Sequence, residues 1–516
     1  LNSLSYGGNT VFAEGNGPKL DAFRAPTDND AGIGYHNAWF KFGLYDLDHH
    51  VVGKPTVMKL KDGSLQISMT VESQGKEGSR QVYGNRDRDP QSAYRFGVDK
   101  QKLGKDDLKF ITNQIYTIYK DGSIELNSAI SANRNSVILP RIGYAMKLPN
   151  TYKQFDYYGR GPVNNYNDRK TGQFIEHHRG IVGEQDILLP KPQSMGNREE
   201  VRWCALTEQG KQSVVFVADS TMSVSALPWS AQQMTVVAHA NELPASDGTY
   251  LHLDAKVTGL GGASCGQGGP LKDDRTYSQN YNFGFVIRPA QATASAVAEA
   301  SKVSLSGEQP ISIEHKQTGK VLLSTPAKNR TIVYTVNGAK KPTVYTGAID
   351  MSKGGTITTW YKETPGQKTT MTFDKVDFVP LQIAFVSSEE PEEGDAVNLV
   401  DGDETTIWHT MYSITLAKYP HWVDFDASEP KTIKGFKFMP RQDTGYGRIK
   451  NYEIYVSNDG KTWGNAILKG EFDRSGELKT VMFDKPVKAR YVRFRALNAH
   501  YGVDYASAAE FSLIAE

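Results

Sequence analysis

The stretch SLQISMTVES, residues 64–73, is typical of the runs that decide the fold of this chain. β-Branched and aromatic residues are enriched in such runs, and short runs bounded by Gly, Asn or Asp indicate β-strands. Further runs recur at short spacing, among them SIELNSAISA (123–132), QSVVFVADS (212–220) and NFGFVIRP (282–289). Sustained helical periodicity is scarce. We therefore predict an all-β protein built from antiparallel strands.

One Ala- and Ser-rich segment, AQATASAVAEAS (290–301), interrupts this pattern. Its composition suits either a short helix or a linker, and both interpretations stay open on the sequence alone. We place a domain boundary here. The resulting division is a first domain at 1–289, a linker at 290–302, a middle domain at 303–378 and a third domain at 379–516. In the middle domain, Asn337-Gly338 predicts a tight β-hairpin turn.

Composition excludes several classes of protein. The 516 residues include 59 basic and 58 acidic side chains and are 39% hydrophobic, which indicates a soluble protein of several domains. The sequence has no run of basic residues that would bind nucleic acid or an anionic membrane surface. No apolar run reaches the roughly 18 residues that a transmembrane helix needs. The opening LNSLSYGGNTVFAEG reads as strand, turn and strand, so we expect the chain to begin within a longer polypeptide whose targeting signal lies upstream.

The cysteine and histidine residues do not indicate a disulfide framework or a metal site. Cys204 and Cys265 are too few for a disulfide framework, and pairing and free thiols both stay open. Adjacent histidines at 49–50 and 177–178 point to opposite faces of a strand, which does not favour one shared metal. Because no Cys-x-x-Cys, His-x-x-x-His or phosphate-binding loop appears, we expect no hydrolytic metal site.

Four turn-rich segments stand out in the first domain. They are FRAPTDNDAGIG (23–34), YYGRGPVNNYNDRKTG (157–172), PQSMGNREEVRW (192–203) and GLGGASCGQGGP (259–270). Arg24, Arg160 and Arg198 each lie near carboxylates, which favours structural ion pairs over chemistry. In this order and spacing the segments resemble the large C-terminal β-sandwich of family-2 β-galactosidases, over roughly residues 1–289.

The resemblance implies a supporting role for the first domain. In that family the sandwich follows the catalytic barrel and contributes a loop that closes over the mouth of the active site. GLGGASCGQGGP matches this loop, so the expected rim residues are Gly262, Ser264 and Cys265, with Cys265 where many relatives have Trp.

A catalytic acid is not expected in this chain. A retaining glycosidase needs two carboxyl groups roughly 5 Å apart. Asn241-Glu242 in HANELP imitates the Asn-Glu pair of such enzymes, but it falls inside the sandwich, and no strand-helix alternation predicts a barrel. We therefore expect this chain alone to be inactive, although its parent polypeptide would be a β-galactosidase.

The middle domain resembles another small module. IVYTVNGAKKPTVYTGAIDMSKGGTITTWYKE (332–363) is similar to the Ig-like small β-sandwich near the C-termini of chitobiases and related hexosaminidases. Tyr334, Tyr345 and Trp360 suit a sugar platform, but aromatic residues at strand spacing more often belong to a core or interface. We expect this domain to be a spacer.

The third domain carries the strongest binding signal. LVDGDETTIWHTMYS (399–413) crowds carboxylates, a Trp-His pair and a Tyr into one loop. With YPHWVDFD (419–426), ARYVRFRAL (489–497) and YASAAEFSLI (505–514), it resembles discoidin-like (coagulation factor 5/8 type C) domains, more closely their family-32 carbohydrate-binding branch. The resemblance implies an eight-stranded jelly-roll sandwich, a structural calcium ion and a sugar site in the loops at one end.

The family's residues can be placed on this sequence. The implied calcium ligands are Asp401, Asp403, Thr406 and Glu510 with the carbonyls of Asn398 and Ala509, a set of hard oxygen donors. The implied galactose site comprises Glu392, His409, Tyr412, Arg441 and Tyr505, with Tyr412 where relatives commonly have Trp. Arg441 has an alternative role as a surface partner of Asp443. We expect Trp408 in the core.

These resemblances favour one function class over another. The favoured class is a non-catalytic, carbohydrate-binding part of an extracytoplasmic β-galactosidase, with galactose-containing glycans and the catalytic domains of the same polypeptide as partners. β-Glucuronidase and β-mannosidase are alternatives within it. The other class is an adhesion or scaffold protein. A lipid-binding discoidin domain would carry apolar spikes on its loops, where we expect Tyr, His, Arg and Glu.

Overall fold

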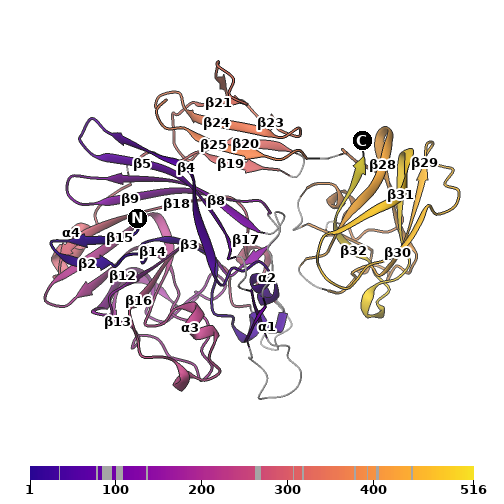
Figure 1. The fold of residues 1–516 in the computed structure, drawn as a ribbon. Helices are drawn as coiled ribbons and strands as arrows, with labels where there is room; N and C mark the ends of the chain where they lie inside the picture. The colour runs from indigo at the N-terminus through magenta and orange to yellow at the C-terminus, as the bar shows by residue number, and fades with distance from the viewer. Residues whose placement is uncertain are drawn as a thin grey trace.

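In the computed structural model the secondary structure is almost entirely β-strand, arranged in three domains (Figure 1). The described residues are 1–33, 35–76, 80–83, 96–99, 108–134, 137–261, 269–305, 307–316, 319–376, 379–391, 393–402, 406–442 and 445–515. Their α-helices are α1 (Asp28–Ile33), α2 (Tyr35–Lys41), α3 (Ala231–Thr235) and α4 (Ala294–Ala300). None of the helices described is long and apolar enough to cross a membrane. The predicted all-β class is confirmed.

The first domain is a sandwich whose layers share one long strand. Its strands are β1 (Leu4–Tyr6), β2 (Asn9–Phe12), β3 (Lys19–Asp21), β4 (Leu47–Lys59), β5 (Leu65–Gly75), β6 (Arg80–Tyr83), β7 (Phe96–Asp99), β8 (Lys109–Ile118), β9 (Ile124–Ala132), β10 (Ile138–Leu139), β11 (Arg141–Leu148), β12 (Tyr152–Gly161), β13 (Phe174–Ile181), β14 (Arg198–Glu208), β15 (Gln212–Leu227), β16 (Thr249–Val257), β17 (Thr276–Tyr277) and β18 (Tyr281–Gln291). Twelve of them form one sheet in the order β13-β12-β14-β15-β18-β9-β8-β5-β4, with β16, β11 and β3 attached through β15. Residues 212–218 of β15 pair with β18, whereas residues 223–227 pair with β16. The same strand therefore belongs to both layers.

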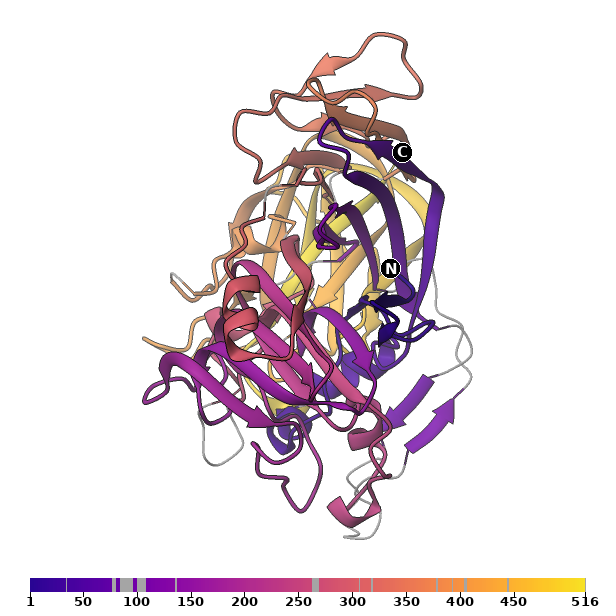
Figure 2. The same cartoon turned by 90° about the vertical axis from the view of Figure 1, so that its left-hand side faces the viewer.

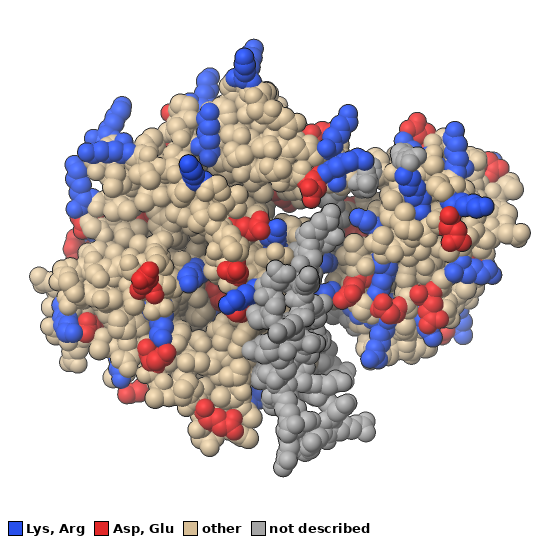
Figure 3. Space-filling view, viewed as in Figure 1, with Lys and Arg blue, Asp and Glu red and all other residues tan. Residues whose placement is uncertain are grey.

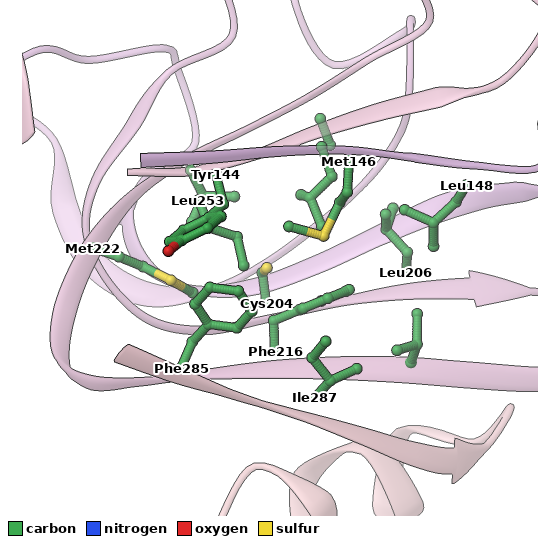
Figure 4. Close-up of a cluster of buried hydrophobic side chains, with 14 of the residues drawn as sticks. Tyr144, Met146, Leu148, Cys204, Leu206, Phe216, Met222, Leu253, Phe285 and Ile287 are labelled. Carbon is green, nitrogen blue, oxygen red and sulfur yellow. The ribbon is translucent and has the colours of Figure 1, made fainter. Parts of the chain in front are cut away.

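The core lies between β11 and β16 on one side and β14, β15 and β18 on the other (Figure 4). Successive side chains of a strand point to opposite faces, so Tyr144, Met146 and Leu148 of β11 enter the core together. Cys204 is fully buried there as a free thiol, and burial raises its pKa. Cys265 lies outside the described residues.

The Ala-rich segment after the first domain is a helix, one of the two alternatives that the sequence left open. β18 extends to Gln291, and the Thr293 hydroxyl then accepts a hydrogen bond from the amide of Ala296, which caps α4. Val297 and Ala300 of α4 pack against a cluster that includes Val215 of β15. The helix is therefore docked on the first domain.

The middle domain is a small sandwich of two sheets above the first domain (Figure 1, Figure 2). Its strands are β19 (Ser312–His315), β20 (Lys320–Ser324), β21 (Ile332–Val336), β22 (Thr343–Val344), β23 (Ile349–Asp350), β24 (Gly355–Tyr361) and β25 (Thr369–Phe373). Asn337 and Gly338 have φ of 50° and 72°, and the amide of Ala339 donates to the carbonyl of Val336. The predicted tight turn is present between β21 and β22. A cleft of about 520 Å³ lies between this domain and β4, β5 and β8, and beside it Nδ2 of Asn113 in β8 donates a 3.1 Å hydrogen bond to the carbonyl of Ile311.

The third domain is a jelly-roll sandwich beside the first domain (Figure 1). Its strands are β26 (Gln382–Val386), β27 (Trp408–His409), β28 (His421–Pro440), β29 (Asn451–Ser457), β30 (Leu468–Glu471), β31 (Lys479–Ala496) and β32 (Ser507–Ala515). We expected eight strands, and the described residues form a seven-stranded sheet. The register of β28 against β31 shifts between Asp426 and Lys431, so each long strand contributes to both layers. Phe425 and Phe511 stack at 4.2 Å between ring centroids inside the core.

Charge is mixed on the molecular surface. On the face in Figure 3, basic and acidic side chains of the described residues are interspersed over all three domains. One exposed ion pair, Lys41–Glu477 at 2.9 Å, links α2 of the first domain to the third domain.

Candidate functional site

Three aromatic rings meet at one end of the third domain. His409 ends the short strand β27, which pairs with the start of β32. The ring of Tyr505, just before β32, stacks on the His409 ring with centroids 5.0 Å apart, and the Tyr412 ring meets it edge-on at 4.9 Å. Pairing of β27 with β32 therefore brings together three residues of the predicted galactose site.

The imidazole of His409 is held as a neutral hydrogen-bond acceptor. Its Nδ1 lies 2.6 Å from the carbonyl oxygen of Thr410. A carbonyl can only accept, so Nδ1 carries a proton, and in the neutral ring Nε2 keeps a lone pair. The residue is 6% exposed, and burial lowers its pKa, with the Arg441 charge acting in the same direction. His409 can therefore accept a hydrogen bond from a ligand hydroxyl.

Arg441 supplies the donor groups of the site. It follows β28 directly and is half-buried. Its positive charge lowers the pKa of His409 and opposes the rise in the pKa of Tyr412, so it acts on both neighbours. The carbonyl of Arg441 accepts a 3.0 Å hydrogen bond from Nε of Arg448, which fixes the backbone here. The alternative partner, Asp443, lies outside the described residues.

Two carboxylates that the sequence analysis missed contact Tyr412. The predicted acid, Glu392, lies outside the described residues. Its neighbour Glu390 accepts hydrogen bonds from the amides of Tyr412 at 2.6 Å and Ser413 at 3.0 Å. Glu393 accepts a 2.5 Å hydrogen bond from the Tyr412 hydroxyl and raises its pKa. The acid-rich run SSEEPEEGD (387–395) signals a carboxylate here but not which one.

Three hydrogen bonds from side chains and backbone hold the chain in place around Tyr505. The Tyr419 hydroxyl donates to the carbonyl of Tyr505 at 2.9 Å, and Nε2 of His421 donates to the carbonyl of Asp504 at 2.9 Å. The next amide, of Ala506, donates to the Thr410 hydroxyl at 3.0 Å. An ordered platform costs little conformational entropy when a ligand binds.

The described residues among the predicted calcium ligands lie in the loop before β27 and on β32. The Thr406 hydroxyl donates to a carboxylate oxygen of Asp401 at 2.8 Å, and Asn398 lies in the 3₁₀ turn 396–399, which contacts β32. Trp408 of β27 pairs with Ala508 of β32, two residues before Glu510 on the same strand. Ala509 is fully buried on the same strand. Asp403 lies outside the described residues.

The donor atoms in this loop suit a hard cation. Carboxylate, hydroxyl and carbonyl oxygens are the ligands that Ca²⁺ prefers. Two carboxylates of the predicted set, Asp401 and Glu510, are described, and within the described part of the chain no group of three His, Cys, Asp or Glu side chains could hold a metal ion. Trp408 is 1% exposed and belongs to the core, as expected.

The predicted rim loop of the first domain has an anchored base. Gly262, Ser264 and Cys265 lie outside the described residues. Before them, Nδ2 of Asn29 donates to the carbonyl of Leu260 at 2.7 Å, and the Asp168 carboxylate accepts from the amide of Gly261 at 2.7 Å.

The arginines of the turn-rich segments form the ion pairs that the sequence predicts. Arg24 pairs with Asp30 at 2.6 Å and also donates to the carbonyl of Gly259. Ion pairs at 2.8 Å and 2.9 Å join the other two arginines to carboxylates: Arg198–Asp186 and Arg160–Glu200. The structural interpretation of these arginines is confirmed.

Glu242 has a local role. Its carboxylate accepts a hydrogen bond from the amide of Ala238 at 2.9 Å and contacts Nδ1 of His239 at 3.1 Å. The side chain is 46% exposed, and the hydrogen bond with His239 lowers its pKa. A lowered pKa is the opposite of what a general acid needs at neutral pH.

The middle-domain aromatics contribute to packing. Tyr334 and Tyr345 contact each other at 6.5 Å between centroids and lie against the core of that domain. Trp360 is 8% exposed, with the Lys368 ammonium 4.5 Å from its ring centroid.

One expectation about the third-domain loops is wrong. We expected them to lack exposed apolar side chains, but Ile414 is 78% exposed and Leu416 is 47% exposed. Both lie in the loop that follows Tyr412. The polarity of these loops therefore does not by itself exclude an apolar partner.

Known protein families match two of the three domains. A family described as beta galactosidase small chain matches residues 1–287, and one described as F5/8 type C domain matches residues 382–511. The β-galactosidase of Priestia megaterium is 26% identical over 288 residues, which are 56% of this chain and 24% of that protein. The sialidase of Micromonospora viridifaciens is 36% identical over 148 residues, 28% of this chain and 23% of that protein.

A solved carbohydrate-binding module also matches. This is CpGH89CBM32-5 from Clostridium perfringens in complex with GalNAc-β-1,3-galactose, at 34% identity and a TM-score of 0.25, covering 27% of this chain and 99% of that one. The chain spans about a quarter of the length of the two curated relatives above. Because the first match covers residues 1–287 of 516, the chain belongs to the beta-galactosidase small chain family, and it carries an F5/8 type C domain.

Proposed function

We propose that this chain is the non-catalytic C-terminal part of a family-2 β-galactosidase and that its third domain binds galactose-containing glycans. The observation that carries the proposal is the meeting of His409, Tyr412, Arg441 and Tyr505 at one edge of the sandwich. The chain's family membership and its F5/8 type C domain support the two halves of the proposal.

The site offers the interactions that a hexose needs. Arg441 presents a planar fork of N–H donors to ring hydroxyls, and Nε2 of His409 accepts from a hydroxyl. Tyr412, which is 44% exposed, presents an aromatic face to the apolar C–H face of galactose, and the half-buried Tyr505 ring stacks on His409 and orients it. A few hydrogen bonds and one stacked ring support a dissociation constant of roughly 0.1–1 mM, where 1 mM corresponds to about −4.1 kcal/mol.

The first domain would complete the rim of an active site built by other domains of the same polypeptide. The hydrogen bonds that hold Gly259, Leu260 and Gly261 support this role, because they fix the backbone directly before the predicted rim residues. Gly262, Ser264 and Cys265 would form the tip. This chain would not hydrolyse β-galactosides by itself, and the docked middle domain would act as a chitobiase-like spacer.

A calcium ion would tie the sugar-site loop to the last strand. Asp401, Thr406 and Glu510, with Asp403 and the carbonyls of Asn398 and Ala509, would hold it. The ion's role would be structural, because the loop 398–406 runs directly into Trp408 and His409. An extracytoplasmic location, where calcium and polymeric glycans are both abundant, accords with this arrangement.

Titration calorimetry on the whole chain with calcium present tests the binding proposal. Galactose, lactose and N-acetylgalactosamine are the ligands, and we expect at least one to bind with a dissociation constant in the range given above. If all three fail to bind the calcium-loaded protein, the galactose assignment is wrong.

A further inference from the structure

Two exposed tyrosines pack on each other beside the candidate sugar site. Tyr446 is 57% exposed and Tyr501 is 62% exposed, yet their ring centroids lie only 5.5 Å apart, tilted by 44°. We call these two residues the tyrosine shelf. An exposed aromatic pair leaves apolar surface in water, so it indicates an interaction site rather than a contribution to the core.

The backbone under the shelf is held in an unusual conformation. Tyr501 has φ of 66°, in the left-handed region that bulky residues rarely adopt. Its neighbour His500 is fixed on both sides, since its amide donates to the carbonyl of Arg448 at 2.9 Å and its Nε2 donates to the carbonyl of Phe472 at 3.0 Å. Such conformations persist where the surroundings hold them, and they cluster at ligand-binding sites.

The shelf continues directly into the sugar site. Gly447 follows Tyr446 and lies against the Tyr505 ring, where an added Cβ would come within 3.1 Å of Cδ2. The carbonyl of Gly447 accepts a 2.8 Å hydrogen bond from the amide of Ser507. Because the Tyr505 ring also stacks on His409, Gly447 joins the loop that carries Tyr446 to the sugar site.

The chemistry of the shelf suits a second sugar ring. A phenol offers an apolar face for the C–H groups of a pyranose and a hydroxyl for its oxygens. Consecutive rings of a glycan are covalent neighbours, and Gly447 links the Tyr446 loop to Tyr505 of the first site. Resting on the proposed galactose site, we propose that Tyr446 and Tyr501 form a second subsite, so that the third domain recognises a galactose-terminated oligosaccharide of at least two rings.

Calorimetry on the whole chain can separate the two subsites. The ligands are galactose and two disaccharides that end in β-1,4- or β-1,3-linked galactose, namely lactose and lacto-N-biose. We expect at least one disaccharide to bind about 2- to 10-fold more tightly than galactose, the gain that one aromatic contact typically provides. Tyr446→Ala and Tyr501→Gly should remove this gain and leave galactose binding unchanged, and Gly at 501 also tolerates the left-handed backbone.

Matched variants guard against a purely structural effect. Tyr446→Phe keeps the ring and should keep most of the gain, and Tyr158→Ala removes an exposed tyrosine of the first domain and should change nothing. If galactose binds but neither disaccharide binds more tightly, or if the shelf variants weaken galactose equally, the second subsite is wrong while the galactose site stands. If no sugar binds, both proposals fail. Binding to phosphatidylcholine vesicles that falls in the shelf variants, with sugar affinity unchanged, would instead assign the shelf to a membrane surface.

Discussion

Arginines of the first and third domains have the same chemistry in opposite surroundings. Arg24 and Arg198 are at most 1% exposed, and each forms an ion pair with a buried carboxylate. Arg441 is half-buried at the edge of the third domain, next to a neutral imidazole and exposed rings. The difference shows what burial does to an arginine. A fully buried guanidinium that is paired with a carboxylate stabilises the backbone around it. A half-buried guanidinium beside exposed aromatic rings can still exchange its bound water for a ligand.

The largest effect should come from breaking a buried pair in the first domain. Asp30→Ala leaves the Arg24 guanidinium buried without its carboxylate and should lower the free energy of unfolding by about 3–5 kcal/mol. Chemical denaturation of the whole chain measures this. Glu299→Ala removes one member of the exposed Lys302–Glu299 pair and should cost only about 0.2–1 kcal/mol. Equal losses in the two variants would contradict the scaffold role of Arg24.

Removing calcium should destabilise the third domain alone. A ligand that binds only the folded state adds about 2.7 kcal/mol at a hundredfold excess over its dissociation constant. A chelator should therefore lower the melting temperature of the third-domain transition and leave the first domain unchanged. Asp401→Ala should abolish that response. A melting curve that is indifferent to both chelator and calcium would rule out the site.

Truncating the edge arginine should affect binding more than stability. Arg441→Ala removes charge-assisted hydrogen bonds and should weaken galactose binding by roughly 1–3 kcal/mol with little change in the melting temperature. Arg490→Ala is the matched control, because it removes an arginine of the same domain that pairs with Asp426 at 2.7 Å. Full galactose affinity in Arg441→Ala would place the sugar site elsewhere.

Acidification should weaken sugar binding through His409. Burial and Arg441 lower its pKa below the ordinary value of 6.5, and the Thr410 carbonyl, Glu393 and Glu390 act in the opposite direction. Because the folded pKa is depressed, the stability from this group is complete above pH 6.5 and is lost as the pH falls through the folded value. Affinity should therefore stay flat from pH 8 to 6.5 and fall below it, since protonation removes the Nε2 acceptor.

NMR titration of the His409 ring alongside calorimetry checks this prediction. The two midpoints should coincide, because the same proton controls both signals. Affinity that rises on acidification would show that the sugar accepts a hydrogen bond from His409 instead of donating one.

The smallest effect should come from Glu242→Gln in the first domain. Its carboxylate is exposed and contacts neighbouring residues of the chain, so the stability of the first domain should hardly change. The purified chain should show no turnover of aryl β-galactosides, with or without this change. Turnover destroyed by the substitution would establish Glu242 as a catalytic acid.

The sequence predicted those features that depend on neighbouring residues. Strand-forming runs such as 64–73 lie in strands, and Asn337-Gly338 forms its turn, because both preferences arise from local backbone sterics. The pairing of Arg24 with Asp30, six positions away, also followed from residue type and proximity in the sequence. The loop that holds Trp408 and His409 could likewise be singled out from its composition alone.

Only the tertiary structure decided which distant residues meet. Glu390 and Glu393 became visible as acids at the site once Tyr412 was placed against them. Tyr446 and Tyr501 are 55 positions apart in the chain, and their contact depends on the loops after β28 and β31 reaching the same edge. The docking of α4 on β15 likewise depended on which face of the sheet remained open. Strand register and the packing of loops over a shared core are set by the whole chain, because a shift of one residue exchanges the inner and outer faces of a strand.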